Sequence, residues 1–110
     1  MSKYIEIEHI GVMLKEEFMD EFGLSMNALA NAIGVPANYI HGIVHGTRGI
    51  SAEMDLRLTR YFGLSDGYFL RFQAHYDMIK ARQKLSEDKI KRIIPRTQQL
   101  QMRAENRISA

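Results

Sequence analysis

Residues 37–42 bring an amide, a phenol and an imidazole together with two very small residues on one expected helix face. The amide of Asn38 can pair bidentately with N6 and N7 of adenine, and Ala37 can contact a thymine methyl group. Tyr39 could contact a thymine methyl or a phosphate, or instead pack on the loop that follows the helix. These groups suit base recognition in a DNA groove, and the candidates for base-edge contact are Ala37, Asn38, Tyr39, His41 and Gly42.

A second set of residues could bind the phosphate backbone. Thr47 and Arg48 follow the same helix directly, and Arg48 is the strongest candidate of the set, its alternative being a solvated loop arginine. Ser25 and Asn27 begin the preceding helix and can offer a hydroxyl, an amide and free backbone N–H groups to a phosphate. The phosphate candidates are Ser25, Asn27, His45, Thr47 and Arg48.

Other chemistry finds no support in the sequence. His41 and His45 are four residues apart, which suits two metal ligands on one helix, but no third ligand is evident and the chain has no cysteine. A complete zinc site needs three or four ligands. No Ser–His–Asp set and no phosphate-cradling loop can be found. We therefore expect no metal, no cofactor and no enzymatic activity.

The elements that would position these residues form a predicted helix–turn–helix. One helix is expected over Met26–Ile33 with Ser25 as its cap, and the next over Pro36–Val44, where a first-turn proline loses no hydrogen bond. Gly34 can take the positive φ of a tight turn between them. Such a pair projects one exposed helix face into a DNA major groove. The positions expected to face inward are Leu29, Ala30, Ile33, Ile40, Ile43 and Val44.

The whole chain is expected to be an all-α protein, with a five-helix Xre/lambda-repressor-like helix–turn–helix domain over residues 9–85. The three further helices are Ile10–Glu21, Ala52–Phe62 and Asp66–Lys84, the last two capped by Ser51 and Ser65. In the first of them Leu14, Phe18 and Phe22 recur every four residues. Residues 1–8 alternate apolar and charged side chains, which predicts a short strand or an extended arm.

Residues 86–110 are expected to add a basic C-terminal extension. Ser86, Glu87 and Asp88 open a short helix that Pro95 terminates, and residues 96–110 look aperiodic and flexible. Residues 1–70 hold five Lys/Arg against nine Asp/Glu (net −4), whereas residues 71–110 hold ten against four (net +6). The expected DNA-reading segment therefore lies in the acidic half. With 110 residues, 45% of them apolar, and no membrane-length apolar run, a single cytoplasmic domain is expected.

An aromatic stripe on the last long helix predicts contact with a second copy of the chain. Its residues are spaced three, four and three apart, the pitch of a seam between helices. The alternative is that the stripe only packs on the other helices of its own chain. The stripe consists of Phe69, Phe72, Tyr76 and Ile79.

Residues 46–63, which run from the loop through the fourth expected helix, resemble the HigA/VapI group of antitoxins within the Xre-like helix–turn–helix proteins. The next helix is similar to the same group at Ser65, Phe69, Leu70, Gln73, Tyr76 and Asp77, and the resemblance extends over about His9 to Met78. It implies a cytoplasmic dimer that binds its own operator in double-stranded DNA. It also implies a cognate toxin, commonly a RelE-like ribosome-dependent ribonuclease.

Three departures from the group's pattern each remove a polar or cationic group. His9 is followed by Ile10, Gly11 and Val12 rather than by Pro, Gly and Glu, so Val12 replaces an acidic residue. Met26 stands where Gln is frequent, and Thr47 stands where Lys is usual. The function predicted is an antitoxin that represses its own operon and neutralises a ribonuclease toxin. The alternatives are a stand-alone repressor without a toxin, and a protein–protein adaptor that has lost DNA binding.

Overall fold

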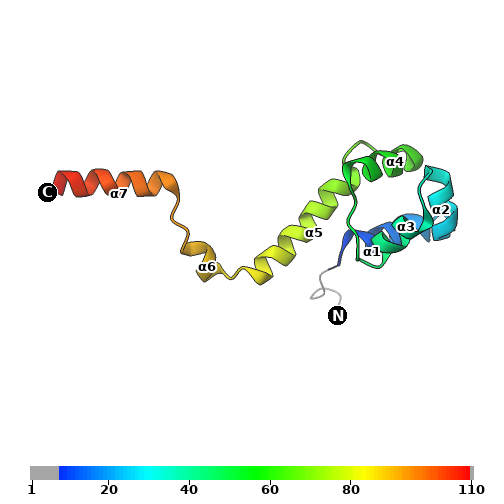
Figure 1. The fold of residues 1–110 in the computed structure, drawn as a ribbon, viewed down its shortest axis with the longest axis horizontal. Coiled ribbons are helices and arrows are strands. Elements are labelled where there is room, and N and C mark those ends of the chain that lie inside the picture. Colours follow the sequence, from blue (N-terminus) through cyan, green and yellow to red (C-terminus); the bar gives the residue numbers. More distant parts are fainter. Residues whose placement is uncertain (1–7, 110) are drawn as a thin grey trace. The chain divides into compact units, whose positions relative to one another are not determined.

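The computed structural model describes residues 8–109, and all the regular structure in that range is helical (Figure 1). The predicted all-α class is confirmed, but seven α-helices and one π-helix replace the five helices and short sixth that were expected. The predicted arm, residues 1–8, lies outside the described residues except for Glu8. The elements are α1 Ile10–Met13, η2 Leu14–Met19, α2 Met26–Ile33, α3 Ala37–Val44, α4 Ala52–Phe62, α5 Tyr68–Lys84, α6 Glu87–Lys91 and α7 Arg96–Ser109.

The chain forms two compact units, Met1–Lys80 and Ala81–Ala110, and the helix–turn–helix belongs to the first. The core of that unit is built from apolar residues of each of its helices. Those with no exposed surface are Leu14, Met19, Leu29, Ile40, Ile43, Leu58 and Phe69. The inward positions predicted for α2 and α3 are confirmed as buried, except that Val44 is half-buried.

The first expected helix differs from its prediction because it widens into a π-helix after Met13. The N–H of Asp20 donates to the carbonyl of Lys15 at 2.8 Å, five residues back. Phe22 lies beyond the end of η2 and is 63% exposed, and its ring stacks on that of Phe62 with the ring centres 5.7 Å apart.

The turn between α2 and α3 forms as the sequence predicts. The hydroxyl of Ser25 accepts a hydrogen bond from the N–H of Ala28 at 3.0 Å, and Gly34 has φ of +75°. Pro36 is not in the first turn of α3 but is its N-cap, with an extended ψ of 144°. Arg57 of α4 closes the end of α2 by donating from Nη1 to the carbonyl of Ile33 at 2.7 Å.

A buried carboxylate determines where α5 begins. Asp55 of α4 has no exposed surface, and its oxygens accept from the N–H groups of Gly67, Phe69 and Leu70 at 2.6, 2.9 and 3.2 Å. These donors are the orphan amides that a helix N-terminus leaves unpaired. The predicted cap Ser65 is therefore wrong: its hydroxyl instead accepts from Arg71 Nη2 at 3.2 Å, and α5 begins at Tyr68.

Helices α1 and α3 approach each other at a glycine. A Cβ added to Gly11 would lie 1.8 Å from the carbonyl oxygen of Ile43. That distance is far inside van der Waals contact, so a side chain at this position could not fit between the two helices.

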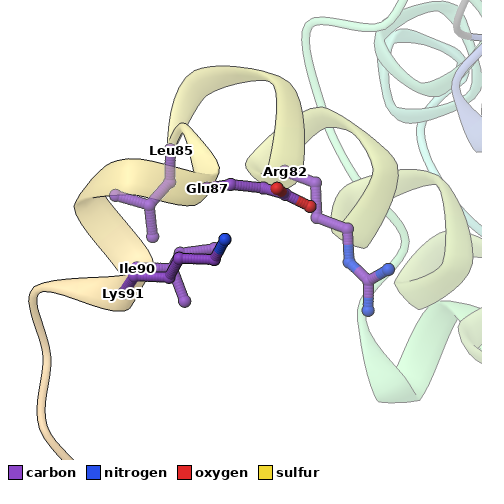
Figure 2. Close-up of a pocket in the computed structure, with 5 residues that line it drawn as sticks. All are labelled: Arg82, Leu85, Glu87, Ile90 and Lys91. Atoms are coloured by element: carbon purple, nitrogen blue, oxygen red, sulfur yellow. The ribbon is translucent and has the colours of Figure 1, made fainter.

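The second unit contains α6 and α7. Ser86 caps α6, as predicted, by accepting from the N–H of Lys89 at 3.3 Å. Residues 96–110 were expected to lack a helical period, but Arg96–Ser109 is a helix that begins directly after Pro95. Pro95 thus precedes α7 rather than ending α6. An open hollow of about 430 Å³ is lined by Arg82, Leu85, Glu87, Ile90 and Lys91 (Figure 2).

Candidate nucleic-acid interface

The first turn of α3 presents the predicted base-reading residues to solvent. Asn38 is the second residue of α3 after the Pro36 cap, and its side chain is exposed. His41, one turn further along, is exposed as well. Ala37 is half-buried and packs partly against the core. Asn38 is therefore the side chain of α3 best placed for a bidentate contact with a base.

Tyr39 and Arg48 form a pair at the edge of this surface. The guanidinium carbon of Arg48 lies 3.8 Å from the centre of the Tyr39 ring, which is a cation–π contact. Tyr39 thus contacts the loop after α3, as the alternative interpretation proposed, while its side chain stays 37% exposed. The stacking limits the positions that the cation can occupy, so Arg48 is not a freely solvated arginine.

Gly42 faces that same loop, so the prediction that it contacts a base is wrong. A Cβ added there would lie 3.1 Å from Cβ of Arg48 and 3.5 Å from Oγ1 of Thr47. The carbonyl of Gly42 accepts from the N–H groups of Thr47 and Arg48 at 2.9 and 3.1 Å, and Thr47 Oγ1 donates to it at 3.3 Å. The absence of a side chain at Gly42 therefore lets the Arg48 loop fold back over the end of α3.

The two histidines of this segment lie side by side. Their rings are nearly parallel, at 3°, with centres 6.1 Å apart, and Nδ1 of His45 lies 2.8 Å from the carbonyl oxygen of His41. A carbonyl only accepts, so Nδ1 carries the hydrogen and His45 closes the end of α3. In the neutral ring Nε2 is then an acceptor, so His45 can donate to a phosphate only when protonated. Among the described residues no group of three or more His, Asp or Glu could hold a metal ion.

The start of α2 offers the other phosphate candidates. Ser25 and Asn27 are both exposed. The Ser25 oxygen accepts from Ala28, and its hydroxyl hydrogen remains able to donate. The first N–H groups of a helix have no intrahelical acceptor, so this end of α2 adds further donors for an anion.

Gln73 of α5 holds the segment that follows Arg48. Its Oε1 accepts from the N–H of Ile50 at 2.6 Å, and its Nε2 donates to the carbonyl of Ile50 at 2.9 Å. The side-chain amide therefore satisfies both backbone groups of one residue. The sequence indicated Gln73 only through its resemblance to the antitoxin group, because the pairing joins positions 23 residues apart.

His9 is a positioning residue for which sequence reasoning found no partner. Its Nδ1 accepts from the N–H of Gly11 at 3.1 Å and so caps α1, and a Cβ on Gly46 would lie 2.8 Å from its Nε2. Burial lowers the pKa of His9 below 6.5, the nearby Lys80 lowers it further, and Glu8 opposes both. The preference for Asn, Asp, Ser and Thr at N-caps gave no signal for this histidine.

The stripe on α5 divides between core and surface. Phe69 is fully buried, and its ring centre lies 5.1 Å from that of Phe18 and 6.4 Å from that of Phe62. Its predicted contact with a second copy is therefore wrong. Phe72 is 40% exposed, and Tyr76 and Ile79 are half-buried. These three residues remain candidates for a partner surface.

Comparison with known proteins places this geometry in a wider context. The helix–turn–helix family matches residues 14–69. Virulence-associated protein I of Dichelobacter nodosus is 42% identical over 87 residues, which cover 79% of each chain. The structure of the Pseudomonas aeruginosa antitoxin HigA with the higBA promoter has 36% identity and a TM-score of 0.75, and the match covers 83% of this chain and 99% of that one. Antitoxin GraA in complex with its operator has 32% identity and a TM-score of 0.74, over 82% and 91% of the two chains.

Within residues 8–109, no helix is both long and apolar enough to cross a membrane. The hollow beside α6 contains none of the predicted site residues.

The contacts described above define the candidate interface. It is the surface formed by the start of α2, the exposed face of α3 and the loop that carries Arg48.

Proposed function

Because this chain belongs to the Xre-like helix–turn–helix family, in the group of HigA/VapI-type antitoxins, we propose that it binds the operator of its own operon as an antitoxin. In this proposal the chain acts as a dimer, represses transcription in the cytoplasm and neutralises a ribonuclease toxin.

The observation that supports DNA reading best is the exposed start of α3 beside a stacked cation. Asn38 is exposed near the Pro36 cap, and Arg48 is held against the ring of Tyr39, the next residue along the chain from Asn38. The amide would contact a base edge and the guanidinium a phosphate, which is the usual division between sequence reading and positioning. Two relatives of similar fold have been captured with promoter or operator DNA, which supports the same assignment.

DNA binding is tested with the full chain and the DNA upstream of its gene. We expect Asn38→Ala to weaken operator binding by about 1–3 kcal/mol per half-site and to relax base choice at one position. Asn31→Ala is the matched control, since Asn31 is also exposed but lies at the far end of α2. Affinities for operator and scrambled duplexes are measured by mobility shift. Unchanged affinity and selectivity in Asn38→Ala would remove α3 from its proposed role.

Toxin neutralisation is tested separately. A small open reading frame next to the gene should encode a protein that stops growth when expressed alone and co-purifies with this chain when both are expressed. Growth should be restored by the co-expressed full chain, and also by Asn38→Ala, because that substitution affects only the DNA surface. If no neighbouring product binds the chain, while operator binding persists, the protein is a stand-alone repressor.

A further inference from the structure

We infer that α7 provides a second DNA-binding element, which contacts the phosphate backbone of duplex DNA through a row of arginines. This inference rests on the proposed function, since it extends DNA binding from the helix–turn–helix to the C-terminal unit. The row is called the arginine face, and it consists of Arg96, Arg103 and Arg107 with the amides of Gln99 and Asn106 beside them.

The spacing of the arginines aligns them on one side of α7. They are separated by seven and four residues, and each residue turns an α-helix by about 100°, so the three side chains lie within about 40° of one another. Gln99 and Asn106 fall at the border of the same sector. All five residues are exposed. At about 1.5 Å per residue, the row extends over about 16 Å of helix.

The opposite side of α7 has a different character. Glu105, the one acidic residue between Arg96 and Ser109, lies about 160° from Arg103 and from Arg107 by the same helical geometry. The positive charge is therefore concentrated on one face of the helix rather than distributed around it.

The distribution of charge along the chain favours a strongly anionic partner. Residues 81–110 hold eight Lys/Arg against three Asp/Glu (net +5), whereas residues 1–80 hold seven against ten (net −3). Helix α3 has no Lys or Arg. Most affinity for DNA comes from cations that neutralise phosphates, and duplex DNA carries one charge per about 1.7 Å of its axis. The reading unit is short of cations, and the arginine face supplies them.

The side chains of the arginine face suit phosphates in particular. Arginine binds phosphate oxygens bidentately through its planar fork, and amide side chains donate to the same oxygens. Helix α7 lies beyond residue 69, where the match to the helix–turn–helix family ends.

The test measures how the affinity of the full chain depends on salt, with fluorescent operator and scrambled duplexes between about 50 and 250 mM salt. Replacing Arg96, Arg103 and Arg107 together by Gln should reduce the slope of log K against log salt by about 2.7 per bound chain, or about 0.9 for each single replacement. The reduction should be equal on both duplexes. Gln keeps the helix propensity close to that of Arg, and circular dichroism confirms that α7 persists.

Two control variants separate the arginine face from general charge. Replacing the same three arginines by Lys keeps the cations and should leave the slope within about 0.5 of the wild type. Replacing Lys89, Lys91 and Arg92 by Gln removes three positive charges from α6 and the residue after it, where helical geometry does not align them on one face. This variant should change the salt slope by less than half of the change in the triple Arg→Gln variant of α7. Equal slopes for this variant and the Arg→Gln variant would overturn the assignment to α7.

The outcomes also distinguish this inference from the proposed function. If the wild type bound operator and scrambled DNA with equal affinity, operator reading would be refuted. The salt slopes of the variants would still test the role of α7. An unchanged slope in the triple Gln variant would overturn the inference and leave operator reading intact. If that variant instead lost binding to vesicles of phosphatidylglycerol and phosphatidylcholine, the arginine face would be a membrane contact.

Discussion

The contact between Arg48 and Tyr39 holds the Arg48 guanidinium at the edge of the candidate DNA surface. The aromatic ring of Tyr39, and not its phenol hydroxyl, makes this contact. A guanidinium that is already held in place loses less side-chain entropy when it meets a phosphate. The contribution of Tyr39 should therefore depend on its ring.

Tyr39→Phe should keep DNA affinity near that of the wild type, whereas Tyr39→Leu should weaken binding to all sequences alike. Arg48→Ala should do the same and should lower the salt slope by about 0.9 per half-site, as expected for one phosphate. Titrations with operator and scrambled duplexes measure both effects. A larger loss in Tyr39→Phe than in Tyr39→Leu would mean that the hydroxyl contacts DNA and that the ring is not a support.

His9 should make the stability of the domain depend on pH. Its pKa is lowered in the folded chain, so the unfolded chain takes up the proton first, and stability falls as pH decreases through the ordinary value of about 6.5. Protonation would also remove the acceptor that caps α1 and place a cation near Lys80 and Arg48, with Glu8 and Asp77 opposing them.

The measurement is urea unfolding at pH 7.5 and pH 5.5 for the wild type and for His9→Asn. Asparagine keeps an N-cap acceptor but cannot titrate. The wild type should lose more stability between the two pH values than the variant. Equal losses in the two proteins would show that the capping ring does not sense protonation.

Individual residues could be assigned from the sequence only where their neighbours in the fold are also neighbours along the chain. Asn38, Arg48 and Ser25 could be selected from residue type and position, because their surroundings are set by neighbours along the chain. Gly42 and Phe69 were assigned to surfaces that they do not form, since the loop that covers Gly42 and the helices that bury Phe69 lie elsewhere in the fold. His9 and Asp55 act through partners that no local pattern reveals.

At the scale of elements, Asp55 joins α4 to the start of α5. Asp55→Ala removes the acceptor of three backbone N–H groups in a buried place, and each unsatisfied group costs about 1–3 kcal/mol. We expect a loss of about 3 kcal/mol or more in the free energy of unfolding, measured by urea. Asp66→Ala, at an exposed acid beside the same helix end, should cost less than about 0.5 kcal/mol. Similar losses in the two variants would contradict the role of Asp55.

The helices themselves were predictable to different degrees. α2 and α4 begin and end as the sequence predicts, because a serine cap and a glycine with positive φ bound each of them. The first helix was not predicted correctly, since a π-turn leaves no mark in residue type. The sequence predicted a flexible tail where α7 forms. The segment has few apolar residues, so no apolar periodicity indicated a helix, although its arginines recur at a helical spacing.

On the scale of the whole molecule, the chain is expected to work as a two-fold dimer with its two α3 helices about 34 Å apart, one turn of DNA. Phe72 is the most exposed residue of the remaining stripe and should lie at that contact. Phe72→Glu should shift the protein toward monomer in sedimentation velocity at tens of micromolar, while Met78→Glu, at an exposed apolar position outside the stripe, should not. A wild-type protein that sediments only as monomer would refute the dimer.

Gly11 is not among the residues proposed to meet DNA, yet the position of α3 depends on it. A methyl group there would lie 1.8 Å from the Ile43 carbonyl, where a carbon and an oxygen normally stay about 3.3 Å apart. Any other residue would have to displace the reading helix by an ångström or more. In a genetic screen for loss of repression, substitutions at position 11 should therefore be recovered, although Gly11 itself is not proposed to contact DNA.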